Sequence, residues 1–571
     1  MILQSLYEYY YRALSQLIPM GYESKAIQFI LLIDKNGKLL NLENTESNYG
    51  GIKEVKEFIV PRAISRTSET IPNLFWDNKE YILENNNKNL SLRNMLEKGI
   101  PDWLREDMGI KAIIKFYDGN GIDVIRNSRY WDEIEKSKNS YFTFKLVGEV
   151  EPIPCSPNVK KYVSELINSS NELNEYKYGI CSITGKNEKI ARIHADTFIN
   201  KDAKKLVCFQ KEQGYDSYKK TQAFNSSIGI SAEFAYTTAL KHLLRRDSAN
   251  KFFLISNKYT TIVFWAEKQN IFEENFSSFF IEKKLEDNPE KNIQIVRSTL
   301  EAVYSGRLSR NDCNTRFYIL GLCQGGGTRI AVRFWKVGTV KQISDSISTH
   351  YNDLEIITNK AIEGKYLPLK VILKSIVRNG DLNSIDPYIE GEVIESIIDQ
   401  NKVYPIRLQE QSLRRIIIGK ESKNFYIQIA ILKACVNRKN RIHNKDTKEI
   451  AMSLDLTNTN QGYLCGRLFS VLEKIQMEAQ PGINSTIKDR YFGAASSTPG
   501  VVFGRLLNLT NYHLGKLRIG RRINMEKLLQ GIIENISSTG MPINLSLDDQ
   551  SRFAIGYYHQ RQDLFTKKIK Q

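Results

Sequence analysis

The side chains suited to nucleophilic, acid–base or metal chemistry are few and widely spaced in this sequence. The six histidines stand at 194, 242, 350, 443, 513 and 559, and none has HExxH or HxH spacing, so a metal-dependent nuclease centre is not indicated. Cys181 and His194, at the ends of CSITGKNEKIARIH, could supply a nucleophile and its base. With no motif around the cysteine, a structural role is the favoured interpretation. We therefore predict a protein without catalytic residues, metal ligands or cofactor.

Two further motifs have competing interpretations. GGGTR (325–329) resembles a phosphate-binding loop, but such a loop needs a strand before it, a helix after it and a terminal Lys-Ser/Thr. Here strand-like sequence lies on both sides, so a hairpin turn is predicted. His559, within YYHQRQ, suits contact with a nucleotide and a core hydrogen bond equally well.

An early polar segment, PRAISRTSETIPNLFWDN (61–78), has no apolar period that would make it a core element. Arginines can reach phosphates or base edges, hydroxyls can bond backbone oxygens, and an amide can read a base edge. Pro72 stiffens the segment and so lowers the entropy lost on binding. The alternative is a surface connection whose Leu74, Phe75 and Trp76 pack inward. The residues predicted to contact DNA are Arg62, Arg66, Thr67, Ser68, Asn73 and Trp76.

Positive charge is concentrated in two later segments. Residues 405–445 hold ten Lys or Arg against two acids, and residues 501–571 hold eleven against five. Helices that bury one face and present cations on the other can follow a phosphate backbone, although a solvated face is the alternative. The residues predicted to contact a nucleic-acid backbone are Arg414, Arg415, Lys420, Lys423, Arg438, Lys439, Arg441, Arg490, Arg505, Lys516, Arg521 and Arg522.

The composition supports a polyanionic partner. The 571 residues include 81 Lys or Arg against 64 Asp or Glu, a net charge of +17, which favours nucleic acid over membrane. The longest apolar runs, such as AIQFILLI, are far shorter than a membrane span. Seven scattered cysteines without CxxC are typical of a reducing compartment, so a cytoplasmic protein is expected.

The elements that must position these residues change in type along the chain. MILQSLYEYYYRALSQL predicts a first helix, Asn36-Gly37 a hairpin turn, 260–266 a buried strand and 316–335 a second hairpin with strict alternation. Residues 231–246 predict a helix with Ser231 as N-cap. From about residue 342 the apolar period becomes helical, as in 462–479.

This pattern predicts an α+β fold, with a mixed α/β N-terminal part containing β-hairpins and an α-helical C-terminal part that ends in a bundle. The predicted domains are 1–341, 342–451 and 452–571.

Several longer strings resemble one known family throughout the chain. They are MILQSLYEYYYRAL, VPRAISRTSETIPNLFWDNKEYIL, CSITGKNEKIARIH, FAYTTALKHLL, TTIVFWAE, FYILGL with RIAVRFW, GRLFSVLEKIQMEAQPGINSTIKDRYFGAASSTPGVVFGRLL and LSLDDQSRFAIGYYHQRQDLF. This set is similar to the large subunit of the subtype I-C CRISPR effector complex, Cascade.

The resemblance implies a non-catalytic DNA-recognition subunit. In such complexes the guide RNA reads the target sequence by base pairing, while protein reads a short flanking motif, the PAM. The resemblance also implies R-loop stabilisation and recruitment of a separate helicase-nuclease. Implied partners are guide RNA, double-stranded target DNA, the displaced strand, and the backbone and 5′-end-binding subunits of Cascade; a membrane is not among them.

The resemblance further implies a second product of the same gene. In such systems a small subunit arises from an internal translation start, and Met452 precedes a strongly predicted helix and would leave a basic helical fragment of 120 residues. Two other functions remain open from the residues alone. A stand-alone nuclease would use the region of Cys181 and His194, and a general RNA-binding protein would show no preference for a DNA motif.

Overall fold

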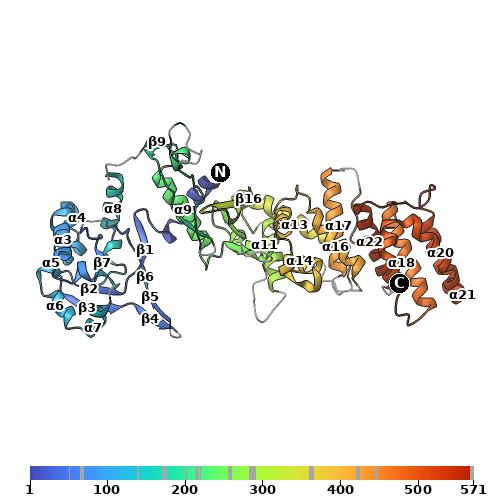
Figure 1. The fold of residues 1–571 in the computed structure, drawn as a ribbon, viewed down its shortest axis with the longest axis horizontal. Coiled ribbons are helices and arrows are strands. Elements are labelled where there is room, and N and C mark those ends of the chain that lie inside the picture. The colour runs from blue at the N-terminus through green and yellow to red at the C-terminus, as the bar shows by residue number, and fades with distance from the viewer. Residues whose placement is uncertain are drawn as a thin grey trace. The chain divides into compact units, whose positions relative to one another are not determined.

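The computed structural model describes residues 1–49, 52–64, 70–137, 140–169, 177–199, 202–211, 218, 220–254, 260–281, 291–305, 307–358, 366–419, 425–443 and 448–565. The chain forms two compact units (Figure 1). The first comprises Met1, Leu3–Ala195 and Phe209–Leu240, and the second comprises Ile2, Asp196–Cys208 and Lys241–Gln571.

A four-stranded mixed sheet forms the centre of the first unit, in the order β3-β2-β8-β7. The apolar run FILLI forms β2, which pairs in parallel with β8 and antiparallel with β3. A parallel pair needs a long crossover connection, and here the helices between the two strands supply it. The strands of this unit are β1 (Tyr22–Ala26), β2 (Phe29–Ile33), β3 (Leu39–Asn44), β4 (Glu46–Tyr49), β5 (Ile52–Val55), β6 (Glu57–Pro61), β7 (Trp76–Asn78), β8 (Tyr141–Leu146), β9 (Tyr178–Ile180) and β10 (Asn187–Lys189).

Helices α2–α8 of the first unit contribute apolar side chains to the core on this sheet. Phe116 and Ile113 of α5 lie in one core with Phe29 and Phe144 of the sheet, and Asp107 caps α5 by accepting hydrogen bonds from its first amides. The helices are α1 (Ile2–Arg12), α2 (Lys79–Ile82), α3 (Asn87–Asn94), α4 (Asp102–Arg105), α5 (Met108–Asp118), α6 (Gly121–Arg126), α7 (Trp131–Lys136), α8 (Pro157–Ser169) and α9 (Ile230–Leu244).

Most of the elements predicted for the first unit are confirmed. The Asn36-Gly37 turn joins β2 to β3, with Gly37 at a φ of 80° that an L residue would adopt only with strain. The predicted cap of α9 is wrong, because the helix begins at Ile230 and Ser231 lies inside its first turn. The Ser231 hydroxyl donates instead to Glu188 Oε2 at 2.5 Å.

A four-stranded antiparallel sheet, β13-β14-β15-β16, begins the main body of the second unit. One face carries Phe264 and Phe317, whose rings lie 4.7 and 4.8 Å from the ring of Phe276 (centroid to centroid). The strands of this unit are β11 (Thr197–Ile199), β12 (Asp202–Lys204), β13 (Lys251–Phe253), β14 (Thr260–Ala266), β15 (Arg316–Gln324) and β16 (Ile330–Thr339).

The predicted hairpin at 316–335 is confirmed, and GGGTR is its turn. Its strict alternation is not retained, because the register shifts where Gly321 pairs with Phe334 and Leu322 with Val332. Arg333 is the extra residue of this bulge, and its Nε donates to the Cys323 sulfur at 3.1 Å.

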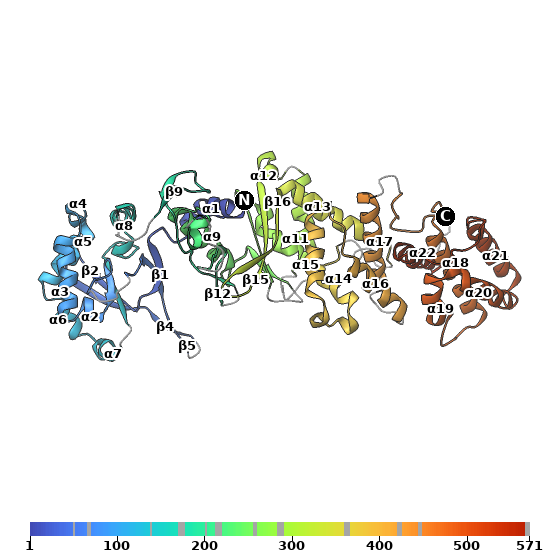
Figure 2. The ribbon, with the colours of Figure 1, turned by 45° about the horizontal axis from the view of Figure 1, so that its top comes forward.

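After Thr339 the structure describes helices and no strands, as the sequence predicts. Within this unit α13 lies beside the sheet, α14, α16 and α17 follow, and α18–α22 come last (Figure 1, Figure 2). The helices are α10 (Ile271–Asn275), α11 (Lys291–Tyr304), α12 (Arg310–Asn314), α13 (Val340–Leu354), α14 (Leu369–Ile376), α15 (Pro387–Ile398), α16 (Ile406–Ile418), α17 (Phe425–His443), α18 (Gln461–Ala479), α19 (Ile487–Ser497), α20 (Pro499–Leu514), α21 (Ile519–Ile533) and α22 (Leu547–Phe565).

Two long helices, α18 and α22, form the centre of the last group. Leu468, Leu472 and Ile475 of α18 are buried on the predicted apolar face. Gly466 lets the two backbones approach so closely that an added Cβ would lie 2.0 Å from the Phe553 carbonyl oxygen. The fold class is therefore confirmed as a mixed α/β N-terminal half followed by a helical half in which α16–α22 pack as a bundle. In the part of the chain that the structure describes, no helix has the length and hydrophobicity of a membrane span.

Candidate nucleic-acid interface

The segment 61–78 leaves the end of β6 and returns at the start of β7, and a hydrogen bond joins its two ends. Trp76 has no exposed surface, and its indole Nε1 donates to the Pro61 carbonyl at 2.8 Å. The ring of Tyr141 neighbours that of Trp76, and Lys25 lies over it with Nζ 4.0 Å from the Tyr141 ring centroid. A buried indole needs a partner for its N–H, and here that requirement closes the base of the loop.

A second set of bonds fixes the returning half of the loop. The Asn73 side-chain oxygen accepts from the Ile64 amide at 3.0 Å, and the Asn73 amide donates to Asp77 Oδ2 at 2.9 Å. Phe75 holds a φ of 65°, a costly conformation for a bulky residue, and its carbonyl accepts from the Thr143 hydroxyl at 3.2 Å. The loop base is therefore a preorganised clamp.

The predicted DNA-binding residues of this segment that the structure describes differ in their burial. Asn73 is 3% exposed and Trp76 is fully buried, so both hold the loop and neither presents its side chain to a ligand. The prediction of direct contact is thus corrected for these two residues to a positioning role, because their polar atoms are used inside the protein. Arg62 is exposed, whereas Arg66, Thr67 and Ser68 lie outside the described residues.

The cations of 405–445 are mostly engaged in packing. Arg438 is fully buried, with Nη2 2.7 Å from Asp353 Oδ2, so its prediction as a phosphate contact is wrong. Arg441 bonds both Asp353 and Glu449, at 2.7 Å from each. These hydrogen bonds, those to Glu449 first, raise the pKa of Arg441.

Other predicted backbone contacts lie at the surface, and several of them already have partners. Arg415 donates to the Ile376 carbonyl at 3.2 Å, and Lys439 pairs with Asp548 at 2.7 Å. Arg414 is exposed and makes no hydrogen bond or ion pair among the described residues. Lys420 and Lys423 lie outside the described residues.

The C-terminal segment shows the same division. Arg521 makes two bonds of 2.7 Å to Glu478, which lower the pKa of that carboxyl group, and Arg522 pairs with Glu526 at 2.8 Å. Arg505 lies over the ring of Tyr491, 5.8 Å from its centroid. Within the described part of the chain, the exposed cations without an ion pair here are Arg490, Arg505, Lys516, Arg518 and Lys527.

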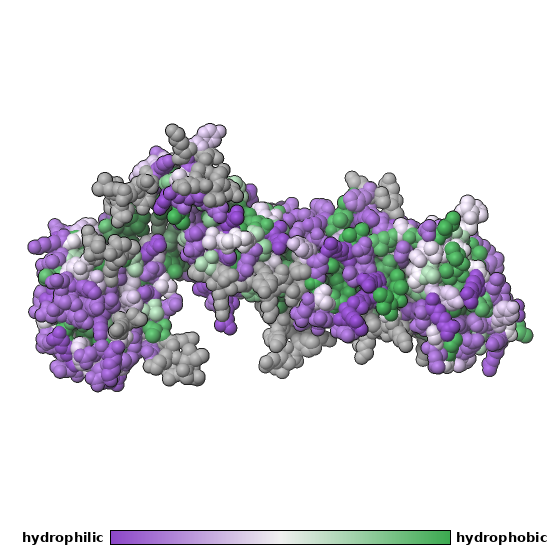
Figure 3. Space-filling model, viewed as in Figure 1, coloured by the Kyte–Doolittle hydropathy of each residue, from purple (hydrophilic) through white to green (hydrophobic). Residues whose placement is uncertain are grey.

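Arg518 and Lys527 are not among the backbone contacts predicted from the sequence. The sequence does contain a sign that these two cations are unpaired, because neither has an acid three or four residues away that could pair with it on a helix. Arg522, by contrast, has Glu526 four residues on. Hydrophobic residues (green) also reach the visible surface among hydrophilic ones over these helices (Figure 3). The exposed hydrophobic residues of α20 and α21 include Leu509, Ile519 and Ile523.

Replacing Arg518 and Lys527 together by alanine is expected to weaken duplex DNA binding and to reduce the slope of log affinity against log salt by about two, since each lost phosphate contact removes about 0.9. The control is the double replacement of Arg521 and Arg522, which removes the same charge from sites where Glu478 and Glu526 already compensate it. Fluorescence anisotropy over a salt series measures both. A larger slope change in the control would contradict the division into paired and unpaired cations.

The two histidines and the cysteine singled out from sequence are buried. Cys181 is fully buried and accepts from the Thr184 amide, and His194 is 1% exposed with Nδ1 bonded to the Tyr236 hydroxyl. His559, 1% exposed, bonds through Nδ1 to the Tyr463 hydroxyl at 3.0 Å, so of its two interpretations the core hydrogen bond is the one found. Among the described residues no three His, Cys, Asp or Glu side chains form a group that could hold a metal ion.

Lowering the pH from 7 to 5 is expected to destabilise the second unit. Burial lowers the pKa of His350 and of His559 to about 3, from an ordinary 6.5. Unfolding therefore takes up protons below pH 6.5, and the stability present above that pH is lost as the pH falls toward 3. Between pH 6.5 and 5 the loss is about 2 kcal/mol for each histidine.

Urea denaturation at the two pH values measures this loss. His350→Gln keeps a hydrogen-bonding side chain next to the Tyr404 hydroxyl, which lies 2.7 Å from Nδ1 in the parent chain, and is expected to shrink the pH difference. The exposed His443→Gln should leave it unchanged. A parent chain equally stable at both pH values would show that these imidazoles are not buried neutral groups.

Met452 lies between α17 and α18, in the connection that precedes the last five helices. Its side chain is 48% exposed, and its carbonyl accepts from the Ile357 amide at 2.9 Å. A chain beginning at Met452 would contain α18–α22 and lack α16 and α17, whose Gln409 bonds Ser551 at 2.9 Å. The use of Met452 as a translation start stays a prediction.

Comparison with known proteins identifies the family. No curated protein matches the chain. The model of the Cas_Csd1 family, described as CRISPR-associated protein (Cas_Csd1), matches residues 6–565. This match spans both units, the clamped loop at 61–78 and the cationic C-terminal helices, so the chain belongs to the Cas_Csd1 family, the large subunits of the type I-C CRISPR effector complex.

Proposed function

We propose that this protein is the non-catalytic subunit that reads the PAM in double-stranded DNA, helps to open the duplex, stabilises the R-loop and recruits a separate helicase-nuclease. The family membership supports the setting, a guide-RNA complex in which pairing reads the target and protein reads only the flank. In this proposal the loop at 61–78 reads the PAM, and the helices of the second unit bind the opened strands.

The observation that carries the proposal is the clamped loop at 61–78. The bond from Trp76 to Pro61 and the bonds of Asn73 hold both ends of the segment, while Arg62, directly after β6, is exposed. A base-reading element needs donors held at fixed positions, because each good bidentate contact contributes about 1–3 kcal/mol only when it is oriented. We therefore place PAM recognition on Arg62 and Arg66, with Thr67 and Ser68 as partners of the phosphates.

The unpaired cations of the helical half support the proposal for the opened strands. Arg414, Arg490, Lys516, Arg518 and Lys527 are exposed without ion pairs in the described part of the chain, and a cationic surface contacts phosphates irrespective of sequence. A fragment beginning at Met452 would carry four of them, and we propose it as the small subunit. The partners proposed for the full-length protein are guide RNA, double-stranded target DNA and the displaced strand, the backbone and 5′-end-binding subunits, the small subunit and the helicase-nuclease.

A library of target duplexes with a randomised flank tests PAM reading for any flanking motif. The assembled parent complex should enrich a short flanking sequence, and Arg62→Ala combined with Arg66→Ala should reduce that enrichment tenfold or more, as expected from losing about 1–3 kcal/mol per contact. Arg126→Ala, an exposed arginine of α6 that pairs with Asp123, is the control.

Complex assembly is measured in parallel by co-purification. Trp76→Phe removes the bond to the Pro61 carbonyl but keeps an aromatic ring in place, and it should lower enrichment severalfold through a looser loop. Equal enrichment by the parent and the double arginine variant, with assembly intact, would refute the proposal for this loop.

A further inference from the structure

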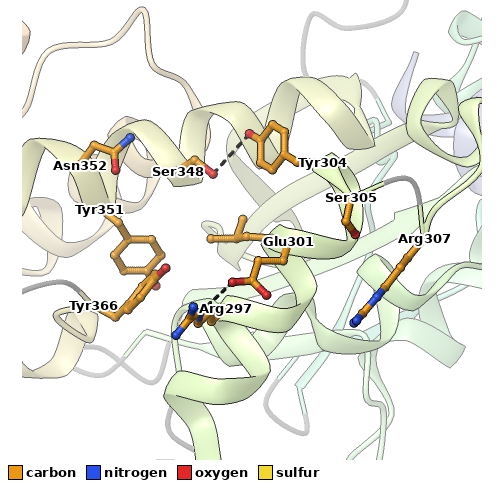
Figure 4. Close-up of a pocket in the computed structure, with 10 residues that line it drawn as sticks. Arg297, Glu301, Tyr304, Ser305, Arg307, Ser348, Tyr351, Asn352 and Tyr366 are labelled. Atoms are coloured by element: carbon orange, nitrogen blue, oxygen red, sulfur yellow. Dashed lines mark hydrogen bonds and ion pairs between the residues drawn. The ribbon is translucent and has the colours of Figure 1, made fainter. Parts of the chain in front are cut away.

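A cleft of about 610 Å³ lies in the second unit between α11 and α13, well away in sequence from the loop at 61–78 (Figure 4). Its volume is within the range of small-ligand pockets. Tyr351 and Tyr366 lie together at one end, Arg297 and Glu301 of α11 lie beside them, and Arg307 lies on the other side of Glu301.

Two tyrosine rings in contact form one side of the cleft. Tyr351 is 5% exposed, and its ring meets that of Tyr366 at a centroid distance of 5.1 Å and an angle of 66°. Tyr366 is only partly buried, so its ring is the one a ligand can reach. Tyr304, on the other side, donates its hydroxyl to Asp345 Oδ1 at 2.7 Å. Tyr366 thus offers the cleft an aromatic face on which a planar group can stack.

Two of the charged side chains of the cleft form an ion pair with each other, and the third does not take part in it. Arg297 Nε donates to Glu301 Oε1 at 2.7 Å, which neutralises that carboxylate and leaves Oε2 as an acceptor. Arg307 is exposed and makes no hydrogen bond or ion pair among the described residues. The cleft therefore combines an accessible aromatic ring, a carboxylate oxygen that can accept a hydrogen bond, and a guanidinium without a partner among the described residues.

We propose that this cleft binds single-stranded nucleic acid, with one base stacked on Tyr366 and a neighbouring phosphate on Arg307. Stacking on aromatic rings together with cationic contacts to the backbone is the general mode of single-strand binding. Glu301 Oε2 is placed to accept a hydrogen bond from a base amino group, which cytosine has at its edge and thymine lacks. The inference rests on the proposed function, since it adds a contact for an unpaired strand to a protein that handles opened DNA.

The test uses the purified full chain and fluorescein-labelled 12-nucleotide strands of oligo(dC) and oligo(dT). Tyr366→Ala should lower affinity about tenfold at every salt concentration, as loss of one stacked base predicts, whereas Tyr366→Phe should bind like the parent. Arg307→Ala should lower affinity and reduce the salt slope by about 0.7. The exposed Arg310→Ala, three residues on and outside the cleft lining, controls for loss of one charge. The parent should prefer oligo(dC).

Three results would overturn the inference. The first is unchanged single-strand affinity in Tyr366→Ala and Arg307→Ala chains with parental thermal stability. The second is a parent chain that binds neither strand. The third is weaker co-purification of other subunits with unaltered strand binding, which would make the cleft a protein contact. The proposed function is tested separately, because the selection of a flanking sequence is measured on duplexes with the assembled complex. Its loss in the Arg62 and Arg66 variant therefore does not depend on whether the cleft binds a single strand.

Discussion

Replacing Arg438 by methionine is expected to lower the free energy of unfolding by about 3–5 kcal/mol, because removing one partner of a buried ion pair leaves a charge uncompensated. The guanidinium has no exposed surface and lies 2.7 Å from Asp353 Oδ2. It also donates to the Ser396 carbonyl at 3.1 Å and to the Tyr404 hydroxyl at 3.2 Å. All of these bonds join α17 to α13 and to the α15 region, so their loss affects the packing of the second unit.

The neighbouring Lys439→Met is the matched control. It removes the same charge one residue away, from a pair with Asp548 whose lysine side chain is 48% exposed, and exposed pairs contribute at most about 1 kcal/mol. Urea denaturation of both chains gives the comparison. A methionine variant at 438 that is as stable as the parent but binds nucleic acid more weakly would instead make Arg438 a surface contact.

The basic segments show which part of the site could be predicted from sequence. The excess of cations in 405–445 and 501–571 is a property of composition, and composition alone is enough to indicate a polyanionic partner. Which cations are free depends on acids far away in the chain: Asp353 for Arg438, and Glu478 for Arg521. Such pairs of distant residues have no local signal. Spacing indicates only local pairs, such as Arg522 with Glu526 four residues on and Arg552 with Asp549 three residues before it.

Local chemistry explains what was predicted well in the fold. Gly37 and the GGGTR turn were found because positive φ restricts the residue type at a hairpin, and α18 was found because its apolar period is helical. The cap of α9 failed because a tertiary partner, Glu188, takes the Ser231 hydroxyl. The polar loop at 61–78 was located from composition, but the inward use of Asn73 and Trp76 depended on the positions of Ile64 and Pro61 in the folded chain.

Introducing one methyl group at Gly466 is expected to destabilise the helical half by about 3 kcal/mol or more, at the upper end of overpacking effects. A Cβ there would lie 2.0 Å from the Phe553 carbonyl oxygen, and the neighbouring contact is equally close, since a Cβ at Gly556 would lie 2.2 Å from the Tyr463 carbonyl oxygen. Both obstacles are backbone atoms of the opposite helix, so no side-chain rotation relieves them. α18 and α22 must move apart, and the buried side chains between them lose contact.

The same substitution at Gly504 has the opposite expected sign. Gly504 lies inside α20 with nothing within 4 Å of the added Cβ, so alanine should stabilise the chain by about 0.5–1 kcal/mol through lower backbone entropy of the unfolded state. Thermal and urea unfolding of the two full-length variants measure the difference. Since α18 and α22 both follow Met452, Gly466→Ala should also lower the yield of a fragment that starts there, while Gly504→Ala should not. Equal stability of the two variants would mean that the close approach of α18 and α22 does not hold this half of the protein together.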